Sequence, residues 1–348
     1  MQTTMKGMVD NMKNASRFNK KSVLQFLQNN AIIILMLIIA VIVGFLEPNF
    51  MSGGNFKNLT MNTAPRFIIA LGVSGALITK GTDLSAGRLA GLGACIAATL
   101  LQRSNYSGKI YPNLSDLNII LVFGITMLIC GVFGLANGMI ISFLKVPPFI
   151  ATLGMQTLVY GISLVYTGAK PIGGLRDDFT VLASGSFFKD GFIEIPYLLV
   201  IAAVCGGLMW VLYNKTRHGK YMYAIGGNEH AAEVAGVNTS KTKIIIYTLA
   251  AAFYALGGML LAAKSGGTSV NMGMGYELEA IAACTIGGVS TNGGVGRVSG
   301  ILIGVVVFEL LKISMQFLGV ETNYTYIVQG LVIIIAVALD LRKYLAKK

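Results

Sequence analysis

The sequence predicts an all-α polytopic membrane protein with about ten transmembrane helices. Among its 348 residues 54% are hydrophobic and only 12% are charged, whereas soluble domains carry roughly 25% charged residues. The mean hydropathy is +0.70, and the 43 glycines suit helices that pack closely in lipid, where small residues permit the approach. Because several spans are short or interrupted by glycine, we expect one or two of them to be broken or re-entrant.

The individual spans follow from the rule that about 20 mostly apolar residues cross a bilayer as a helix. The ten predicted spans are residues 27–46, 62–80, 86–102, 117–144, 149–167, 195–213, 244–264, 276–290, 297–318 and 324–341. Residues 1–26 are predicted to be an N-terminal tail and not a signal peptide, because the apolar run after them ends in Glu47-Pro48 without a small-residue cleavage pattern. Residues 27–341 form the predicted membrane domain, and residues 342–348 a C-terminal tail.

The positive charge of the chain is explained by membrane orientation. The formal net charge is +12, but the Lys and Arg residues are scattered between apolar spans and form no basic patch interleaved with aromatic residues, so we expect no nucleic-acid partner. An even number of spans puts both termini on one side, and the basic residues at both ends make that side cytoplasmic. The same alternation puts loop 214–243 inside and the acidic loop around Asp177 and Glu194 outside.

The sequence lacks the signatures of an enzyme. Its four cysteines fall in apolar stretches without paired spacing, so we expect neither a disulfide framework nor a metal site. The Gly-Lys pairs at 108–109 and 219–220 are not followed by the Ser or Thr that a phosphate-binding loop requires. With two histidines and no Gly-x-Ser-x-Gly or His-Glu-x-x-His pattern, the chain is predicted to be a non-enzymatic protein without a cofactor.

The longest polar interval of the second half, residues 214–243, carries the signals of one short helix. Two glycines permit a sharp turn, an Asn suits the N-cap, a Glu suits the first turn, and a further glycine stands where the helix should stop. In order, these residues are Gly226, Gly227, Asn228, Glu229 and Gly236. They predict a helix over residues 229–235.

A helix of about two turns is unstable alone in water, so it must pack against its own protein or a partner. Its apolar residues, Ala232 among them, are small, and none is the Trp, Phe or Leu typical of a helix on the membrane surface. This favours docking into a cleft of a protein partner. The alternative is an ordinary connecting loop with one helical turn.

Four acidic or hydroxyl residues near span boundaries are assigned to a structural or gating motif. Asp83 and Ser85 precede the third span, where they suit the free amides and the positive dipole end of a helix N-terminus. The alternative for Asp83 is proton or cation coupling, because ionisable groups near membrane depth are functional candidates. Glu277 and Glu279 open the eighth span and suit its N-terminus.

Glu309 and Lys312 lie one turn apart within the ninth span. We predict that they pair with each other, because a mutual ion pair lowers the free-energy cost of burying either charge. They are also the charged residues near the midplane that an ion-coupled secondary transporter of a small polar solute would use. That class is the alternative function of the chain.

The fifth predicted span carries a polar stripe at three- and four-residue spacing, so these side chains share one face of the helix. Its members are Thr152, Gln156, Tyr160, Ser163 and Thr167. The stripe serves either hydrogen bonding between helices or a wet path for a hydroxyl-bearing solute, and Gln and Tyr suit sugars. We assign Thr152, Gln156, Tyr160 and, from the preceding span, Asn137 to a substrate pathway.

Several longer motifs carry a family resemblance. They are Gly-Thr-Asp-Leu-Ser-Ala-Gly at 81–87, Pro-Phe-Ile-Ala-Thr-Leu-Gly at 148–154, Ala-Ile-Gly-Gly-Asn at 224–228, Tyr-Glu-Leu-Glu-Ala-Ile-Ala-Ala at 276–283, Gly-Gly-Val-Ser at 287–290 and Gly-Gly-Val-Gly at 293–296. From about the first span onward the chain resembles the membrane permeases of sugar-importing ABC transporters of the ribose/galactose type. The wording at 81–88 and 293–296 is most similar to the galactose/methyl-galactoside branch.

The resemblance implies a type II-like ABC importer permease that forms a homodimer in the bacterial cytoplasmic membrane. It implies two kinds of partner besides the lipid bilayer: an ABC ATPase subunit on the cytoplasmic side and an extracytoplasmic sugar-binding protein. In this family the Gly-Gly-Asn loop and the short helix after it touch the ATPase. That role falls here on Gly226, Gly227, Asn228, Glu229, Ala232 and Gly236.

Two positions depart from the family pattern. Relatives usually carry Asn where this chain has Lys312, and the usual Trp-Gln near the start of the last span is Tyr-Thr, with Thr325 in the Gln position. These departures concern the solute and leave the class unchanged. From the motifs as a whole, we expect a permease subunit that forms the path of an ATP-driven sugar importer, for galactose, methyl galactoside or a related monosaccharide.

Overall fold

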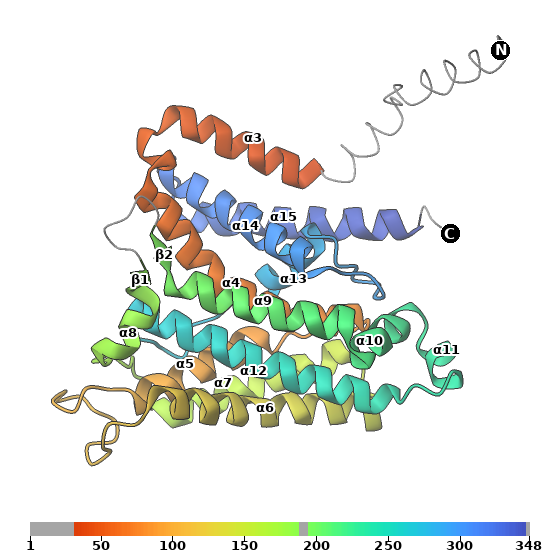
Figure 1. Ribbon diagram of the computed structural model, residues 1–348, viewed down its shortest axis with the longest axis horizontal. Helices are drawn as coiled ribbons and strands as arrows, with labels where there is room; N and C mark the ends of the chain where they lie inside the picture. Colours follow the sequence, from red (N-terminus) through yellow and green to blue (C-terminus); the bar gives the residue numbers. More distant parts are fainter. Residues whose placement is uncertain (1–30, 188–193, 346–348) are drawn as a thin grey trace, which may run out of the picture.

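The computed structural model describes residues 31–187 and 194–345 of the chain (Figure 1). Within them the helices are α3 (Ala31–Leu46), α4 (Gly53–Ile78), α5 (Ala86–Leu100), α6 (Ile119–Phe143), α7 (Pro148–Thr167), α8 (Asp177–Ser184), α9 (Tyr197–Lys215), α10 (Arg217–Gly227), α11 (Glu229–Val234), α12 (Thr239–Ser265), α13 (Tyr276–Ile286), α14 (Val298–Phe317) and α15 (Thr322–Leu345). A 3₁₀ turn, η1 (Pro48–Met51), and one antiparallel pair of two-residue strands, β1 (Ser186–Phe187) and β2 (Ile195–Pro196), complete the elements. The predicted all-α class is confirmed.

Seven of these helices are long and apolar enough to cross a membrane, namely α4, α6, α7, α9, α12, α14 and α15. Helices α3 and α5 are apolar but shorter, with 16 and 15 residues. The start of the first predicted span, 27–30, and the predicted tail 1–26 lie outside the described residues. Helix α15 continues to Leu345, so it includes the first residues assigned to the C-terminal tail.

The eighth predicted span, 276–290, is only half a crossing. Helix α13 has 11 residues, about 16 Å at 1.5 Å per residue, whereas the hydrocarbon core is about 30 Å thick. Residues 266–275, which join α12 to α13, are irregular and include three glycines with positive φ, Gly266, Gly273 and Gly275. This segment fits the expectation of a broken span.

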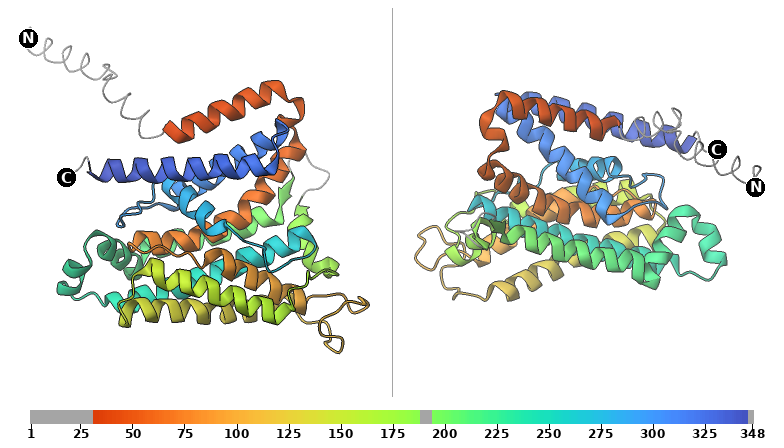
Figure 2. Two further views of the ribbon diagram at one scale, coloured as in Figure 1. Left: turned by 180° about the vertical axis from the view of Figure 1, so that it is seen from behind. Right: turned by 45° about the horizontal axis from the view of Figure 1, so that its top comes forward.

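Helix α4 is the centre of the bundle, and 83% of its most apolar window is buried. Helices α3, α14 and α15 lie along one side of the bundle and α6 and α7 along the other, with α4, α9 and α12 between them (Figures 1 and 2). Small residues permit this density: a Cβ at Gly258 of α12 would overlap the carbonyl oxygen of Ala90 in α5. The glycine-rich composition therefore has the packing role that lipid-embedded helices require.

The outer faces of the bundle are apolar. Side chains such as Phe45, Ile120 and Val165 are more than 80% exposed, although soluble proteins rarely expose large contiguous apolar surfaces. In α15 only 11% of the apolar window is buried. These faces are suited to lipid or to another membrane subunit.

Two opposite ends carry the polar elements. We call the end with α10, α11 and the turn 287–297 the α11 end, and the end with α8, β1, β2 and η1 the α8 end (Figure 1). At the α8 end Arg103 donates to Asp177 at 2.7 Å, and Lys57 pairs with Glu194. Each of these two ion pairs joins segments that lie far apart in the sequence.

Two helices and one helix start were missed in the sequence. Helix α4 begins at Gly53, nine residues before the predicted span, because Ser52 caps it by accepting from the Asn55 amide at 3.2 Å. Helices α8 and α10 were not predicted, since both are short and contain several polar residues. Helix α10 also overturns one interpretation, because Gly226 and Gly227 form its last turn instead of a sharp chain reversal.

Candidate functional site

The α11 end presents two capped helices in succession. Thr216 Oγ1 accepts from the Gly219 amide at 3.0 Å and starts α10. Asn228 Oδ1 accepts from the Ala231 amide at 3.0 Å and starts α11, as predicted. Gly236 follows with φ +85°, a conformation that favours glycine and ends the helix.

Not all of the small apolar residues of helix α11 face outward, as the docking prediction for Ala232 requires. Ala232 is buried within its own chain, while Val234 is 79% exposed. The helix is tied to α12 by Lys243 Nζ, 2.6 Å from Glu229 Oε1, and by Thr239 Oγ1, which donates to Glu233 Oε1 at 2.7 Å. Ala232 therefore packs within the subunit, whereas Ala231, Val234 and Ala235 are exposed, and Val234 is the largest apolar side chain among them that a partner could contact.

Helix α10 is joined to the turn 287–297 by direct backbone contact. A Cβ at Gly226 would overlap the carbonyl oxygen of Ile78 and the amide nitrogen of Gly294. That amide donates to the Ile78 carbonyl at 2.9 Å, and Tyr223 OH donates to the Gly296 carbonyl at 2.9 Å. Gly226 is buried, so it is an internal contact and does not face outward.

The same turn is held from a third direction by α15. Asp340 Oδ2 accepts from the Thr291 amide at 3.0 Å and from Thr291 Oγ1 at 2.8 Å. Within the turn, Gly293 and Gly294 have φ of +83° and +74°, which a residue with a side chain adopts only with strain. The glycines predicted to punctuate this region therefore form a fixed turn that links α4, α10, α13, α14 and α15.

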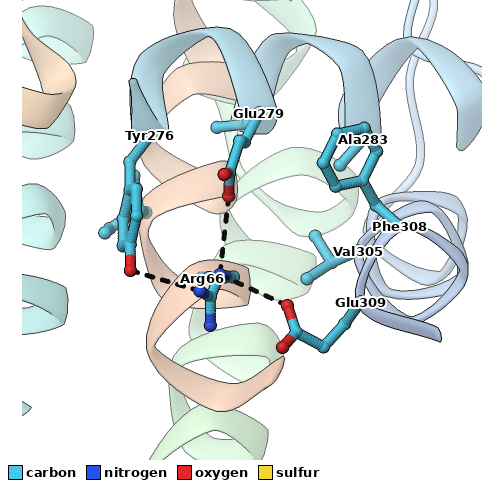
Figure 3. A pocket seen from close by; sticks show the side chains of 9 residues that line it. Arg66, Tyr276, Glu279, Ala283, Val305, Phe308 and Glu309 are labelled. Atoms are coloured by element: carbon cyan, nitrogen blue, oxygen red, sulfur yellow. Dashed lines mark hydrogen bonds and ion pairs between the residues drawn. The ribbon is translucent and has the colours of Figure 1, made fainter. Parts of the chain in front are cut away.

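At its other end α13 enters a buried network of charges (Figure 3). Arg66, midway along α4, has its Nε 3.3 Å from Glu309 Oε2 and 3.5 Å from Glu279 Oε2. Its Nη2 donates to Tyr276 OH at 3.2 Å. Lys312 Nζ lies 2.6 Å from the same Glu279 Oε2.

The predicted pair between Glu309 and Lys312 was therefore wrong. Glu309 pairs with Arg66 of α4, and Lys312 pairs with Glu279 of α13. Within one helix a pair of this spacing contributes only about 0.2–0.5 kcal/mol, whereas in this network each charge meets a charge from a different helix. Each pair thereby holds two elements together.

The space inside this network is too small for a sugar in this conformation. The cavity lined by Arg66, Glu279, Glu309 and apolar residues such as Phe308 has a volume of about 10 Å³, about the minimum for one water molecule. Arg66 Nε, Glu279 Oε2 and Glu309 Oε2 have no aligned hydrogen bond. The network is thus a set of charged contacts between α4, α13 and α14, and not a monosaccharide pocket.

A second buried polar group surrounds Asp83. Its Oδ1 accepts from the Ser85 amide at 2.9 Å and from Ser85 Oγ at 2.6 Å, and its Oδ2 accepts from Tyr254 OH at 3.0 Å. Asn137 Nδ2 donates to Ser85 Oγ at 3.1 Å, and all four side chains are buried. Ser85 is the N-cap residue of α5, but its side chain makes no capping bond, so its predicted capping role was wrong.

The polar stripe on α7 separates into two parts. Thr152, Ser163 and Thr167 are buried, and the last two donate to carbonyl oxygens of the preceding turn at 2.8 Å. Thr152 Oγ1 accepts from the Leu84 amide at 3.1 Å and so joins α7 to the segment before α5. These three hydroxyls serve packing within the subunit.

The other two stripe residues, Gln156 and Tyr160, are half-buried and remain accessible. The Arg88 guanidinium lies over the Tyr160 ring, with 4.0 Å from its carbon to the ring centroid, and Arg88 Nη1 donates to the Val270 carbonyl at 3.1 Å. Cation–π contacts of this kind are favourable where the groups are partly desolvated. Accessible polar groups thus gather where α5, α7 and the irregular segment 266–275 meet.

The starts of α5 and α13 also meet at this place. A Cβ at Gly87 would overlap Glu277 Oε2, and Glu277 is buried in the first turn of α13. As predicted, Glu277 and Glu279 therefore lie at a helix N-terminus, where the dipole favours negative charge. Within a membrane, irregular backbone such as that of residues 266–275 is tolerated only where protein covers it or where it lines a cavity.

Several residues of these groups were missed in the sequence. Arg66 lies inside the predicted span 62–80, and an ionisable residue within a span is itself a signal that was not used. Arg88, Tyr254 and Asp340 gave no local signal, because their roles depend on distant segments. Among the described residues no group of three His, Cys, Asp or Glu side chains is arranged to hold a metal ion.

Comparison with known proteins gives the class. Residues 55–337 match the family described as "Branched-chain amino acid transport system / permease component". The chain therefore belongs to this family of membrane permeases, which confirms the prediction of a transport subunit in place of an enzyme.

Individual relatives are similar over nearly their whole length. The galactose/methyl galactoside import permease of Escherichia coli (strain K12) is 45% identical over 336 residues, which cover 96% of this chain and 100% of the relative. The corresponding permease of Haemophilus influenzae is 43% identical with the same coverage. The ribose import permease of Bacillus subtilis (strain 168) is 36% identical over 88% of this chain and 91% of its own length. No solved structure matches the chain.

Proposed function

We propose that this chain is the membrane-spanning permease subunit of an ATP-driven importer for galactose, methyl galactosides or a related monosaccharide. The observation that carries the proposal is the full-length similarity to galactose/methyl galactoside import permeases, which at 45% exceeds the 36% identity to the ribose permease. The subunit supplies the path, and a separate ABC ATPase supplies the energy.

The ATPase is proposed to dock at the α11 end, which we take to be cytoplasmic. Basic residues concentrate there, among them Arg217, Lys220 and Lys241 of α10 and α12, in agreement with the excess of Lys and Arg in cytoplasmic loops. Asp340 near the end of α15 bonds to the turn 287–297 at this same end. Both termini are accordingly proposed to be cytoplasmic, and the extracytoplasmic sugar-binding protein is proposed to dock at the α8 end.

A second copy of the chain is proposed to pack against α7. This helix exposes a shallow groove of about 950 Å³ that is lined by Gly154, Gly161 and apolar neighbours such as Leu158. Small residues on an apolar helix face permit close approach of another helix in lipid. The solute path is proposed to follow the accessible polar groups Gln156, Tyr160 and Arg88 between the two copies.

Uptake by the reconstituted complex tests this proposal. The chain would be placed in proteoliposomes with its ATPase and binding protein, and uptake of labelled galactose, methyl galactoside, ribose and xylose would be compared at equal ATP. We expect galactose or methyl galactoside to be taken up fastest. Preferred uptake of ribose would overturn the galactose assignment, and absence of sugar uptake in the assembled complex would overturn the sugar class.

A further inference from the structure

The backbone contact between α10 and the turn 287–297 has a consequence for how motion passes through the subunit. We propose that Gly226, Ile78 and Gly294 form a positioning joint, which transmits displacement of the docking helices α10 and α11 to the half-length helix α13. This inference rests on the proposed function, because the displacement comes from the ATPase. Gly226 is then not part of the surface that touches the ATPase, but an internal contact behind that surface.

The contact between α10 and the turn 287–297 is stiff. Where Gly226 meets Ile78 and Gly294, backbone touches backbone with no side chain between them, and the Gly294 amide is bonded to the Ile78 carbonyl. Close-packed interiors transmit strain because they leave little room for local adjustment. A shift of α10 must therefore move the turn with it.

The turn 287–297 is joined rigidly to α13 and α14. The turn directly follows α13 and leads into α14. Helix α13 is packed equally tightly on α14, since a Cβ at Gly304 would overlap the carbonyl oxygen of Ala283 and a Cβ at Gly287 would overlap that of Gly300. Helices α13 and α14 consequently move as one body. Along α13 this body extends about 16 Å from the joint to the start of the helix.

At the far end of α13 the contacts to α4 are of a different kind. There the contacts to α4 are charged ones through Arg66, with long side chains around a cavity of about 10 Å³. Long flexible side chains adapt to small displacements more readily than backbone contacts do. At this end of α13, Met274 and Leu278 are 65% and 47% exposed, and Glu277 lies against Gly87, the neighbour of Arg88 in the sequence. Movement of α13 therefore alters an exposed surface and the surroundings of Arg88.

Gly226→Ala tests the joint, because the added Cβ forces α10 and the turn apart while the exposed Val234 on α11 is left unchanged. The matched control is Gly207→Ala in α9, where an added Cβ meets no atom within 4 Å. In proteoliposomes with the ATPase and binding protein, we expect Gly226→Ala to bind the ATPase and hydrolyse ATP, but to transport at least about fivefold less sugar per ATP than Gly207→Ala.

A gentler variant guards against misfolding. Tyr223→Phe removes only the hydroxyl that bonds to the Gly296 carbonyl, and we expect it to lower the ratio of sugar transported to ATP hydrolysed without weakening ATPase binding. The joint would be overturned if Tyr223→Phe transports as much sugar per ATP as wild type and Gly226→Ala either does the same or no longer binds the ATPase. If wild-type protein shows no ATP-driven sugar uptake, the proposed function fails instead, whatever these variants do.

Discussion

Arg66 Nε lies 3.3 Å from Glu309 Oε2, so a guanidinium from the middle of α4 meets a carboxylate from the middle of α14. Neither group has another opposite charge on its own helix within ion-pair distance among the described residues. Glu309 is only 3% exposed, and the Arg66 side chain is 19% exposed, so the pair lies mostly in the interior. Removing one member of such a pair leaves an uncompensated charge in the interior.

Arg66→Met should therefore destabilise the subunit strongly. We expect a loss of about 3–5 kcal/mol in the free energy of unfolding, since two carboxylates lose their shared cation. Thermal unfolding in detergent measures it, and Lys57→Met, which removes the partially exposed pair with Glu194, should change stability by about 1 kcal/mol or less. Equal midpoints for the two variants would contradict the structural role of Arg66.

Cysteine accessibility should separate the two parts of the α7 stripe. In a background without the four native cysteines, Cys at Gln156 or Tyr160 should react with a water-soluble thiol reagent in at least one nucleotide state. Cys at Thr152 should stay protected, because that position is fully buried. Protection of Gln156 and Tyr160 in every state, in folded protein, would make the whole stripe an interhelical contact.

Val234→Asp should weaken assembly with the ATPase. The side chain is the most exposed apolar group of α11, and placing a carboxylate in an apolar contact costs roughly 1–3 kcal/mol, or about 5- to 150-fold in affinity. Affinity for the purified ATPase measures this, with Val181→Asp on α8 at the opposite end as the control. A Val234→Asp variant that binds as tightly as Val181→Asp would show that α11 does not dock through this residue.

His218 should make the α10 region sensitive to acid. Burial lowers the pKa of His218 below its ordinary value of 6.5, because burial disfavours the charged imidazolium. The unfolded chain then binds the proton first, so stability should fall as the pH drops below about 6.5. The difference in unfolding midpoint between pH 8 and pH 5.5 should shrink in His218→Gln but persist in His230→Gln, whose histidine is exposed. An unchanged difference in His218→Gln would refute this role.

Hydropathy predicted the positions of the long apolar helices, whereas the conformation of the polar segments between them depends on tertiary contacts. The predicted span 149–167 matches α7 to within one residue, because nothing but length and apolarity sets a membrane crossing. In contrast, Gly226 signals a turn when only its neighbours are considered. It instead lies in the last turn of α10, where the contact with Ile78 and Gly294, both distant in sequence, leaves no room for a side chain.

For the candidate site, the sequence indicated which residue types serve as caps and charges, but not which distant residues they contact. The capping role of Asn228 and the acidic start of α13 follow from local rules. The partners of Glu309 and Lys312 come from α4 and α13, and no spacing within one helix could reveal them. Ala232 and Val234 are both apolar, and only the packing of α11 on α12 distinguishes the buried residue from the exposed one.

The source of energy is the most direct test of the proposed function. Vesicles holding this chain with its ATPase and binding protein would be assayed for galactose uptake after ATP removal and, separately, after collapse of the membrane potential with ATP maintained. We expect uptake to stop in the first case and to continue in the second. An ion-coupled carrier would lose about 2.3 kcal/mol per charge for each 100 mV abolished. Uptake driven by a proton gradient in vesicles without any ATPase would contradict the ATP-driven mechanism and point to Glu309 as a coupling group.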